Sequence, residues 1–196
     1  MLAQCYPSAG TSLVFKTPFE LLVAAILSAQ STDKQVNRIT ARLFEKYKSP
    51  QEFALLTPEE LGEEIKGVGL YRNKSRFIIE ASRDIVSIHG GRVPTTRGAL
   101  EALPGVGRKT AGVVIGVAFS GSALPVDTHV YRVARRLGLS AARDPVKVEA
   151  DLSARIPPEQ RMPFHHRLIT HGREICTARK PSCQKCCLRE YCIYPQ

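Results

Sequence analysis

The stretch LPGVGRKTA, residues 103–111, decides how we interpret the fold of this chain. Its proline ends one helical segment, and Gly105 and Gly107 permit a positive φ and close backbone approach before a new helix begins. The first N–H groups of that helix have no partner within it and lie at the positive end of its dipole, so they can bind one phosphate. A plain tight turn is the alternative. The adjacent Arg108 and Lys109 favour phosphate contact.

Helix signals recur on both sides of this stretch, and strand alternation is nearly absent. Two segments, residues 17–20 and 57–60, each offer a threonine N-cap, a proline in the first turn and a glutamate at the third position. Apolar stripes at helical spacing run through residues 36–44, 77–88, 130–137, 146–156 and 164–175. A further run, 113–119, is apolar on every side, which predicts a buried helix. We therefore predict an all-α fold of nine or ten short helices.

Composition and charge narrow the function. The chain has 196 residues and a formal net charge of +10, and 43% of it is hydrophobic, which excludes a disordered tail. The longest apolar stretch, residues 21–27, is about a third of the roughly 20 residues that a membrane-spanning helix needs, and it lacks the flanks of a secretory signal. The excess of Lys and Arg either keeps the protein soluble or attracts a polyanion, of which a phosphate backbone is the first choice.

Lys109 is a candidate nucleophile. It lies near the start of a mostly apolar helix, where loss of hydration, the helix N-terminus and nearby cations would all favour a free amine. Such an amine needs a carboxylate partner, and Asp127 in the segment VDTH, residues 126–129, supplies one. Asp127 also stands where the N-cap of the next helix belongs. Capping and catalysis are compatible, so both roles stay open for this residue.

The cysteines are concentrated at the C-terminal end, unlike those of a secreted disulfide framework. Four of them follow the spacing C-x6-C-x2-C-x5-C, namely Cys176, Cys183, Cys186 and Cys192. Four thiolates at this spacing can hold zinc or an iron–sulfur cluster. Zinc sites commonly use two C-x2-C pairs and only one occurs here, so the spacing favours the cluster. The remaining two, Cys5 and Cys187, are expected to be spare thiols, with Cys5 remote from the others.

The segment between these cysteines is cationic. It carries Arg179, Lys180, Lys185 and Arg189. A positively charged loop that projects from a fixed metal site suits a second contact with a phosphate backbone. The metal site is then expected to act as a scaffold for this loop, since nothing in the spacing demands redox chemistry.

Taken together, the glycine hairpin with Lys109, the following Asp127 and the cysteine ending resemble the endonuclease III family of DNA glycosylases. The resemblance runs over most of the chain, from the segment LSAQSTD of residues 27–33 to Cys192. It implies the helix-hairpin-helix DNA glycosylase fold, with a six-helix barrel domain over residues 12–121. A second domain, formed by residues 1–11 and 122–196, would carry a [4Fe-4S] cluster on the four cysteines.

The resemblance also implies an activity and a set of contacts. The activity is that of a bifunctional DNA glycosylase/AP lyase of base excision repair, which excises oxidised pyrimidines from duplex DNA and cleaves the abasic site 3′ by β-elimination. The lysine at position 109 would form a Schiff base with the sugar, assisted by the aspartate at position 127. By position, Gln30 would fill the hole left by the flipped base and Leu70 would be the apolar wedge. Further DNA contacts are expected at Gly105, Gly107, Arg108, Arg179 and Lys180.

Two other functions stay open at this stage. One is a glycosylase of the same fold directed at mismatches or pyrimidine dimers, and the other is a non-catalytic DNA-binding module. Gly112 stands where the family often has asparagine, so we expect different packing near the pocket. The expected partner is double-stranded DNA with a damaged base or an abasic site, with no membrane involved. We expect a monomer in the bacterial cytoplasm, associated with the nucleoid.

Overall fold

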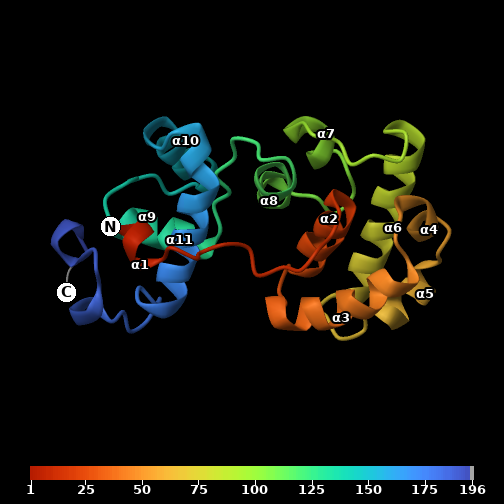
Figure 1. The fold of residues 1–196 in the computed structure, drawn as a ribbon, viewed down its shortest axis with the longest axis horizontal. Helices are drawn as coiled ribbons and strands as arrows, with labels where there is room; N and C mark the ends of the chain where they lie inside the picture. Colours follow the sequence, from red (N-terminus) through yellow and green to blue (C-terminus); the bar gives the residue numbers. More distant parts are fainter. Residues whose placement is uncertain (195–196) are drawn as a thin grey trace. The chain divides into compact units, whose positions relative to one another are not determined.

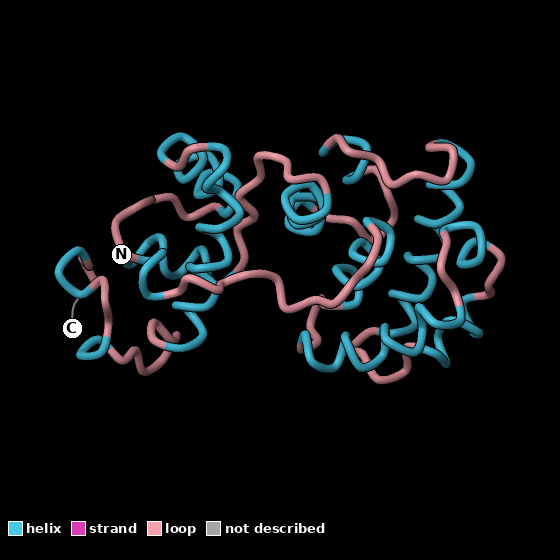
Figure 2. The backbone as a smooth tube through the Cα atoms, in the orientation of Figure 1, coloured by secondary structure: helices cyan, strands magenta, loops and turns pink. Residues whose placement is uncertain are grey.

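The computed structural model describes residues 1–194, and these form helices joined by turns (Figures 1 and 2). No strand occurs among the described residues, so the all-α prediction is confirmed. The α-helices are α1 (Leu2–Cys5), α2 (Pro18–Leu27), α3 (Asp33–Lys46), α4 (Pro50–Ala54), α5 (Pro58–Glu64), α6 (Tyr71–Ile88), α7 (Arg97–Glu101), α8 (Arg108–Ala118), α9 (Thr128–Arg136), α10 (Pro145–Arg155) and α11 (Arg161–Glu174). Three short 3-10 turns follow the same order, η1 (Pro158–Gln160), η2 (Cys183–Lys185) and η3 (Arg189–Tyr191). Within this part of the chain, no helix combines the length and apolarity needed to cross a bilayer.

The chain forms two compact units. The hairpin unit is Ser12–Ser120, and the cysteine unit combines Met1–Thr11 with Gly121–Gln196. The N-terminal residues belong to the cysteine unit because α1 packs on α11. The border expected from the resemblance, between residues 121 and 122, differs by one residue from the border of the hairpin unit.

The helix starts of the hairpin unit follow the predicted signals. Thr17 Oγ1 accepts a hydrogen bond from the Glu20 N–H at 3.1 Å at the start of α2. Thr57 and Glu60 form a capping box at the start of α5, in which each side chain bonds to the backbone of the other residue. Each cap satisfies a backbone N–H that the helix itself leaves without an acceptor.

One apolar cluster fills the hairpin unit. Helix α2 is buried along its whole length from Phe19 to Leu27, and the neighbouring helices α3, α6 and α8 pack on it. Phe53 of α4 is fully buried and meets the rings of Phe19 and Tyr47 edge to face, with centroid distances of 5.2 and 5.8 Å. This edge-to-face geometry is the one that aromatic quadrupoles favour.

Helix α8 differs from its prediction. We expected residues 113–119 to be buried all round, but Val114 is buried and Val113, Ile115 and Val117 are half-buried. The reason is that α8 packs on α2 and α7, which cover only part of its circumference. The prediction of a fully buried helix is therefore wrong.

The cysteine unit has a smaller core. Val130 and Val133 of α9, Leu152 of α10 and Leu168 of α11 are fully buried in one cluster. Beyond α11, Leu188 is the one buried residue in the described part of the chain. The C-terminal segment, residues 175–194, therefore has almost no hydrophobic core of its own.

Candidate functional site

The hairpin at residues 103–111 joins α7 to α8, and its two glycines have different structural roles. Gly105 has φ +75°, and a Cβ there would lie 2.7 Å from the Cβ of Phe77, so a larger residue does not fit. Gly107 is the N-cap of α8 and makes no side-chain cap. A Cβ at Gly107 would meet nothing within 4 Å. The backbone at the start of α8 can therefore be approached closely from outside.

The first turn of α8 carries the candidate nucleophile. The first bond within the helix runs from the Ala111 N–H to Gly107 O at 2.9 Å, so the preceding N–H groups have no acceptor in the helix. Arg108 and Lys109 are both exposed on this turn. The loss of hydration expected for Lys109 is not observed, because Ala111 and Val114 form the buried side of the helix instead. An exposed amine thus stands within one turn of groups that can bind phosphate.

Asp127 is the N-cap of α9, as its position predicts. Its Oδ1 accepts a hydrogen bond from the Val130 N–H at 2.7 Å, and the residue is half-buried. His129 lies two residues after Asp127, and its Nδ1 is 3.2 Å from Arg132 Nη2. Burial lowers the pKa of His129, against the opposing effect of the Asp127 carboxylate. The hydrogen bond from the Val130 N–H thus holds the Asp127 carboxylate in place.

Gln30 and Leu70 share an unusual backbone conformation. Their φ values are +56° and +57°, in the left-handed region that costs a residue with a Cβ about 1–2 kcal/mol. Both are exposed, and the Leu70 side chain keeps 56% of its accessible area. Gln30 lies three residues after the end of α2, and Leu70 is the N-cap of α6. Exposed residues with a strained backbone are typical of positions that contact a ligand.

The four predicted ligand cysteines line one small cavity in the cysteine unit, together with Arg136 and His171. Several hydrogen-bond donors meet their sulfur atoms. Arg136 Nη1 lies 3.4 Å from Cys176 Sγ, and the Leu188 N–H donates to Cys186 Sγ at 3.4 Å. Burial raises the pKa of the Cys186 thiol. The donor set therefore fits a thiolate-bound group.

These cysteines are not arranged around a single ion. Among the described residues, no three His, Cys, Asp or Glu side chains are grouped so as to hold one metal ion. A zinc site would require four ligand atoms at about 2.3 Å from one point. The four thiols instead surround a cavity.

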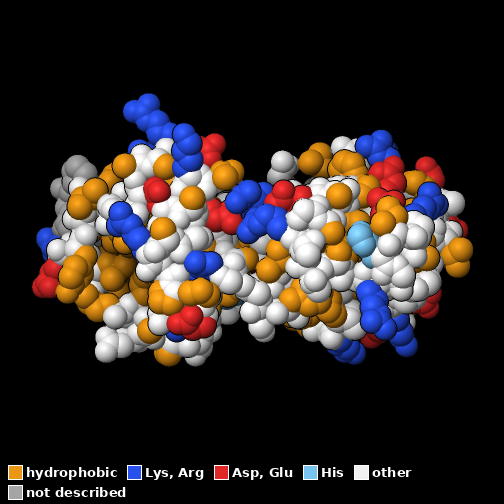
Figure 3. Space-filling view, turned by 90° about the horizontal axis from the view of Figure 1, so that it is seen from above, with side chains coloured by type: hydrophobic (Ala, Val, Ile, Leu, Met, Phe, Trp, Pro, Cys, Tyr) orange, Lys and Arg blue, Asp and Glu red, His pale blue; other side chains and the backbone are white. Residues whose placement is uncertain are grey.

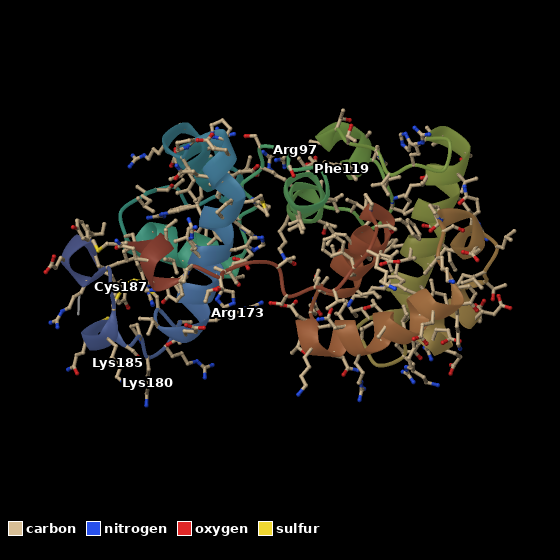
Figure 4. All side chains as sticks on the ribbon, viewed as in Figure 1. Arg97, Phe119, Arg173, Lys180, Lys185 and Cys187 are labelled. Atoms are coloured by element: carbon tan, nitrogen blue, oxygen red, sulfur yellow. The ribbon has the colours of Figure 1, made fainter. Side chains whose placement is uncertain are left out.

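The two remaining cysteines lie together. The Cys5 side chain forms a hydrogen bond with Cys187, and burial and this bond raise the pKa of Cys187 to about 11. Figure 4 labels Cys187 in the C-terminal segment near α1. The expectation that Cys5 is remote is therefore wrong, because the packing of α1 on α11 brings the N-terminus to the cysteine-rich segment. Nothing in the sequence spacing signals this contact.

The cationic loop is fixed by two arginines that the sequence analysis did not select. Arg136 donates to the carbonyl oxygens of Thr177 and Ala178 at 2.8 and 2.9 Å. Arg132, one turn earlier on α9, donates to Cys176 O at 3.0 Å. Their spacing of four residues on one helix face is the signal that could have identified them.

Arg179 and Lys180, the two loop residues predicted to contact DNA, are both exposed. Lys180 and Lys185 point outward from the C-terminal segment in Figure 4. On the face drawn in Figure 3, Lys and Arg side chains are scattered among Asp and Glu over each unit. This face therefore carries no single broad basic patch.

A model of the HhH-GPD superfamily, described as base excision DNA repair proteins, matches residues 23–158. Endonuclease III of Bacillus subtilis (strain 168) is 48% identical over 192 residues, which cover 97% of this chain and 88% of that protein. A solved structure of a trapped endonuclease III–DNA covalent intermediate superposes with a TM-score of 0.94 at 46% identity, covering 98% of this chain and 91% of the other. A thermostable thymine-DNA glycosylase is similar at 26% identity, with a TM-score of 0.89 and coverage of 98% and 92%.

These matches and the hairpin geometry define the class of protein, a base excision DNA repair enzyme with the helix-hairpin-helix glycosylase fold. The chain belongs to the HhH-GPD superfamily and, within it, to the endonuclease III family. It is a DNA glycosylase and AP lyase. The non-catalytic DNA-binding module that the sequence left open is thereby excluded.

Proposed function

We propose that this enzyme excises oxidised pyrimidines from duplex DNA and then cleaves the abasic site on its 3′ side, with Lys109 as the nucleophile of both steps. The observation that carries the proposal is the exposed amine of Lys109 on the first turn of α8, directly behind the open backbone at Gly107. A phosphate held at this helix start would bring the adjoining sugar within reach of the amine.

The proposed reaction begins with a flipped nucleotide, because the sugar and base cannot be attacked inside the duplex stack. Lys109 Nζ forms a bond to C1′ of deoxyribose while the bond from C1′ to the base breaks, and the base leaves with a proton. The nitrogen keeps one hydrogen and forms a C1′=N double bond as the C1′–O4′ bond breaks. O4′ takes up a proton, so the sugar ring opens to a protonated imine. The cationic imine acidifies the C2′ hydrogen, and loss of that proton expels the 3′ phosphate. One lysine thus serves both the glycosylase and the lyase step.

Asp127 is proposed to assist Lys109, by taking a proton from the amine and by stabilising the positive charge that develops on the sugar. Its role as the N-cap of α9 supports the proposal, since the bond to the Val130 N–H fixes the carboxylate. A fixed charge stabilises a transition state without the cost of reorganising at that moment.

The proposed DNA contacts fall into two kinds. Gln30 and Leu70 enter the base stack, with the glutamine filling the space of the flipped base and the leucine acting as a wedge. The others bind the backbone without reading sequence, through Gly105, Gly107, Arg108, Arg179 and Lys180. The duplex carries a damaged base or an abasic site. The proposed working form is a monomer that acts at the bacterial nucleoid.

Cys176, Cys183, Cys186 and Cys192 are proposed to hold a [4Fe-4S] cluster. Support comes from their common cavity and from the donors that meet the sulfur atoms of Cys176 and Cys186. When bound, the cluster supplies four metal–thiolate bonds that fix the C-terminal segment. Arg132 and Arg136 then orient the loop that carries Arg179 and Lys180, through hydrogen bonds to its backbone carbonyl oxygens.

The test is borohydride trapping on duplexes that contain an abasic site. Wild-type enzyme should form a covalent adduct, and Lys109→Gln should form none while DNA affinity stays within about tenfold, since one of several phosphate contacts is changed. The matched control is Lys66→Gln, which removes an exposed lysine of the same unit that pairs with Glu63 at 3.1 Å. This variant should trap as well as wild type.

Either an absent wild-type adduct or a persistent one in Lys109→Gln would contradict the lysine assignment. The lesion class is tested by cleavage of duplexes with thymine glycol, dihydrouracil, a thymine mismatch or a pyrimidine dimer, compared side by side. The proposal expects the first two to be cleaved fastest. Faster cleavage of the mismatch or dimer would instead establish the alternative glycosylase of the same fold.

A further inference from the structure

Lys74, on the second turn of α6, is a buried lysine for which the proposed reaction has no use. Its residue keeps 4% of its accessible area, and Nζ donates to Leu27 O at 2.9 Å and to Ala29 O at 2.5 Å. Leu27 is the last residue of α2, whose final carbonyl groups have no donors within the helix. A cation at this negative end of the helix dipole is favourable. The ammonium group therefore caps α2.

The third contact of the ammonium group extends beyond α2. Ser31 Oγ lies 3.4 Å from Lys74 Nζ and accepts a hydrogen bond from the Gly69 N–H at 3.2 Å. The three protons of the lysine thus find three acceptors in one turn, residues 27–31, and this turn is bonded to the turn that ends at Leu70. A Cβ at Gly69 would lie 3.1 Å from Gln30 O, so the two backbones approach closely.

The backbone of Lys74 acts on the second turn directly. Its N–H donates to Leu70 O at 3.1 Å, and this carbonyl also accepts from the Asn73 N–H at 3.1 Å. Lys74 therefore bonds to both residues that flank Gln30 through its side chain and to Leu70 through its backbone. All of these atoms belong to the hairpin unit, in which α2, α3 and α6 pack together (Figure 1).

We propose that Lys74 is a positioning residue that joins the turns bearing Gln30 and Leu70, so that the two side chains enter DNA at a fixed spacing. The inference rests on the proposed DNA contacts of Gln30 and Leu70. Both side chains have left-handed backbone that a free turn would relax, and the shared lysine keeps the two turns from relaxing separately. A contact surface ordered before binding avoids the cost of ordering it in the complex.

The experiment measures dissociation constants for two duplexes at one salt concentration, an undamaged duplex and one with a tetrahydrofuran abasic analogue. Lys74→Met removes the donors and keeps an unbranched apolar side chain. It should weaken binding to the analogue about tenfold, within the range of couplings between neighbouring residues, and change binding to undamaged DNA less than about threefold. The control Lys66→Met removes the same charge from an exposed position, and it should change both constants equally and slightly.

A double-mutant cycle separates positioning from general structural support. In the Gln30→Ala/Leu70→Ala background, Lys74→Met should cost less than about twofold, because the side chains that it positions are gone. A tenfold loss that persists in this background would overturn the inference, and so would a Lys74→Met variant that matches Lys66→Met on both duplexes. If Lys74→Met does not fold, Ser31→Ala removes the oxygen that Lys74 Nζ and the Gly69 N–H share. It should lower the preference for the analogue severalfold, and an unchanged preference would overturn the inference.

The two levels of the proposal fail differently. Borohydride trapping by wild-type enzyme tests the proposed chemistry and does not depend on Lys74. An enzyme that forms the adduct, but in which the Lys74 effect is additive with loss of Gln30 and Leu70, retains the proposed function and refutes the positioning role.

Discussion

In the hairpin unit, every helix from α2 to α8 contributes to one buried apolar cluster, whereas the cluster of the cysteine unit ends with α11. The segment beyond α11 buries Leu188 and is otherwise exposed or half-buried in its described part. Hydrogen bonds from Arg132 and Arg136 to backbone carbonyls hold its first residues. Hydrophobic burial thus shapes the hairpin unit, and polar contacts shape the C-terminal segment.

This difference has an energetic consequence. A segment of about 20 residues loses conformational entropy of roughly 1–2 kcal/mol per residue when it becomes ordered, and one buried leucine offsets only about 2 kcal/mol. Metal–thiolate bonds would add stability to such a segment, because the free energy of binding becomes free energy of folding. The C-terminal segment should therefore depend on its ligand, while the hairpin unit should not.

The largest effect is expected when the cluster is lost. Cys183→Ser removes one ligand, so the purified variant should lose most of its iron and sulfide, of which wild type should hold about four each per chain. Trypsin should then cut the released segment after Arg179 and Lys185 while the hairpin unit resists. Iron analysis and mass spectrometry of the fragments measure both outcomes.

The control for this experiment is Cys5→Ser, which changes a thiol that is not a proposed ligand and should keep full iron content and protease resistance. A Cys183→Ser protein with unchanged iron and an intact C-terminal segment would remove the ligand assignment. Wild-type protein that is colourless and contains zinc would replace the cluster with a different metal.

A smaller effect is expected from the core of the hairpin unit. Phe53→Ala should destabilise the protein by about 3–5 kcal/mol, because a fully buried ring that touches two other aromatic rings leaves a cavity. Leu55→Ala, two residues away, should change stability by less than about 0.5 kcal/mol, since the leucine is 85% exposed. Denaturant unfolding monitored by circular dichroism measures the difference.

Iron content measured on the same samples shows whether the cysteine unit depends on the stability of the hairpin unit. Phe53→Ala should keep its iron below the unfolding midpoint, because the cysteines lie in the other unit. Iron loss in step with the destabilisation would mean that the two regions do not differ in the way that their cores suggest.

Local chemistry explains what the sequence could predict. The caps at Thr17, Thr57 and Asp127 and the glycine at position 105 each depend on a few neighbouring residues, and all are found as expected. The all-helical class follows from the 3.6-residue apolar period, which also acts within one element. Such features need no knowledge of distant contacts.

Long-range packing explains the errors. The exposure of Lys109 and the half-buried sides of α8 depend on which neighbours cover that helix. The contact between Cys5 and Cys187 joins residues at opposite ends of the chain. Lys74 resembles a surface lysine of an amphipathic helix, and only the end of α2 next to it gives the buried ammonium its acceptors. No period or spacing in the sequence encodes these pairings.

A smaller change in stability than that of Phe53→Ala is expected at Asp127, which is both a helix cap and a proposed catalytic residue. Asp127→Ala removes the acceptor of the Val130 N–H and should cost about 1 kcal/mol of stability, a typical value for an N-cap. Asp127→Asn keeps a good cap, because its amide oxygen can accept the same bond, so its unfolding midpoint should match wild type. If the carboxylate also assists Lys109, both variants should lose about 10²- to 10⁴-fold in single-turnover base excision, as for other enzymes deprived of an acid–base group.

The pair of Asp127 variants separates the two roles because they share the catalytic change and differ in the cap. Full activity in Asp127→Asn would leave Asp127 as a cap only, and the carboxylate that assists the lysine would then have to be sought elsewhere. Loss of stability in Asp127→Asn equal to that in Asp127→Ala would instead show that the charge, interacting with the dipole of α9, matters more than the hydrogen bond. The helix that positions the carboxylate thus also limits how it can be altered, since only the asparagine variant removes the charge while the frame of α9 stays in place.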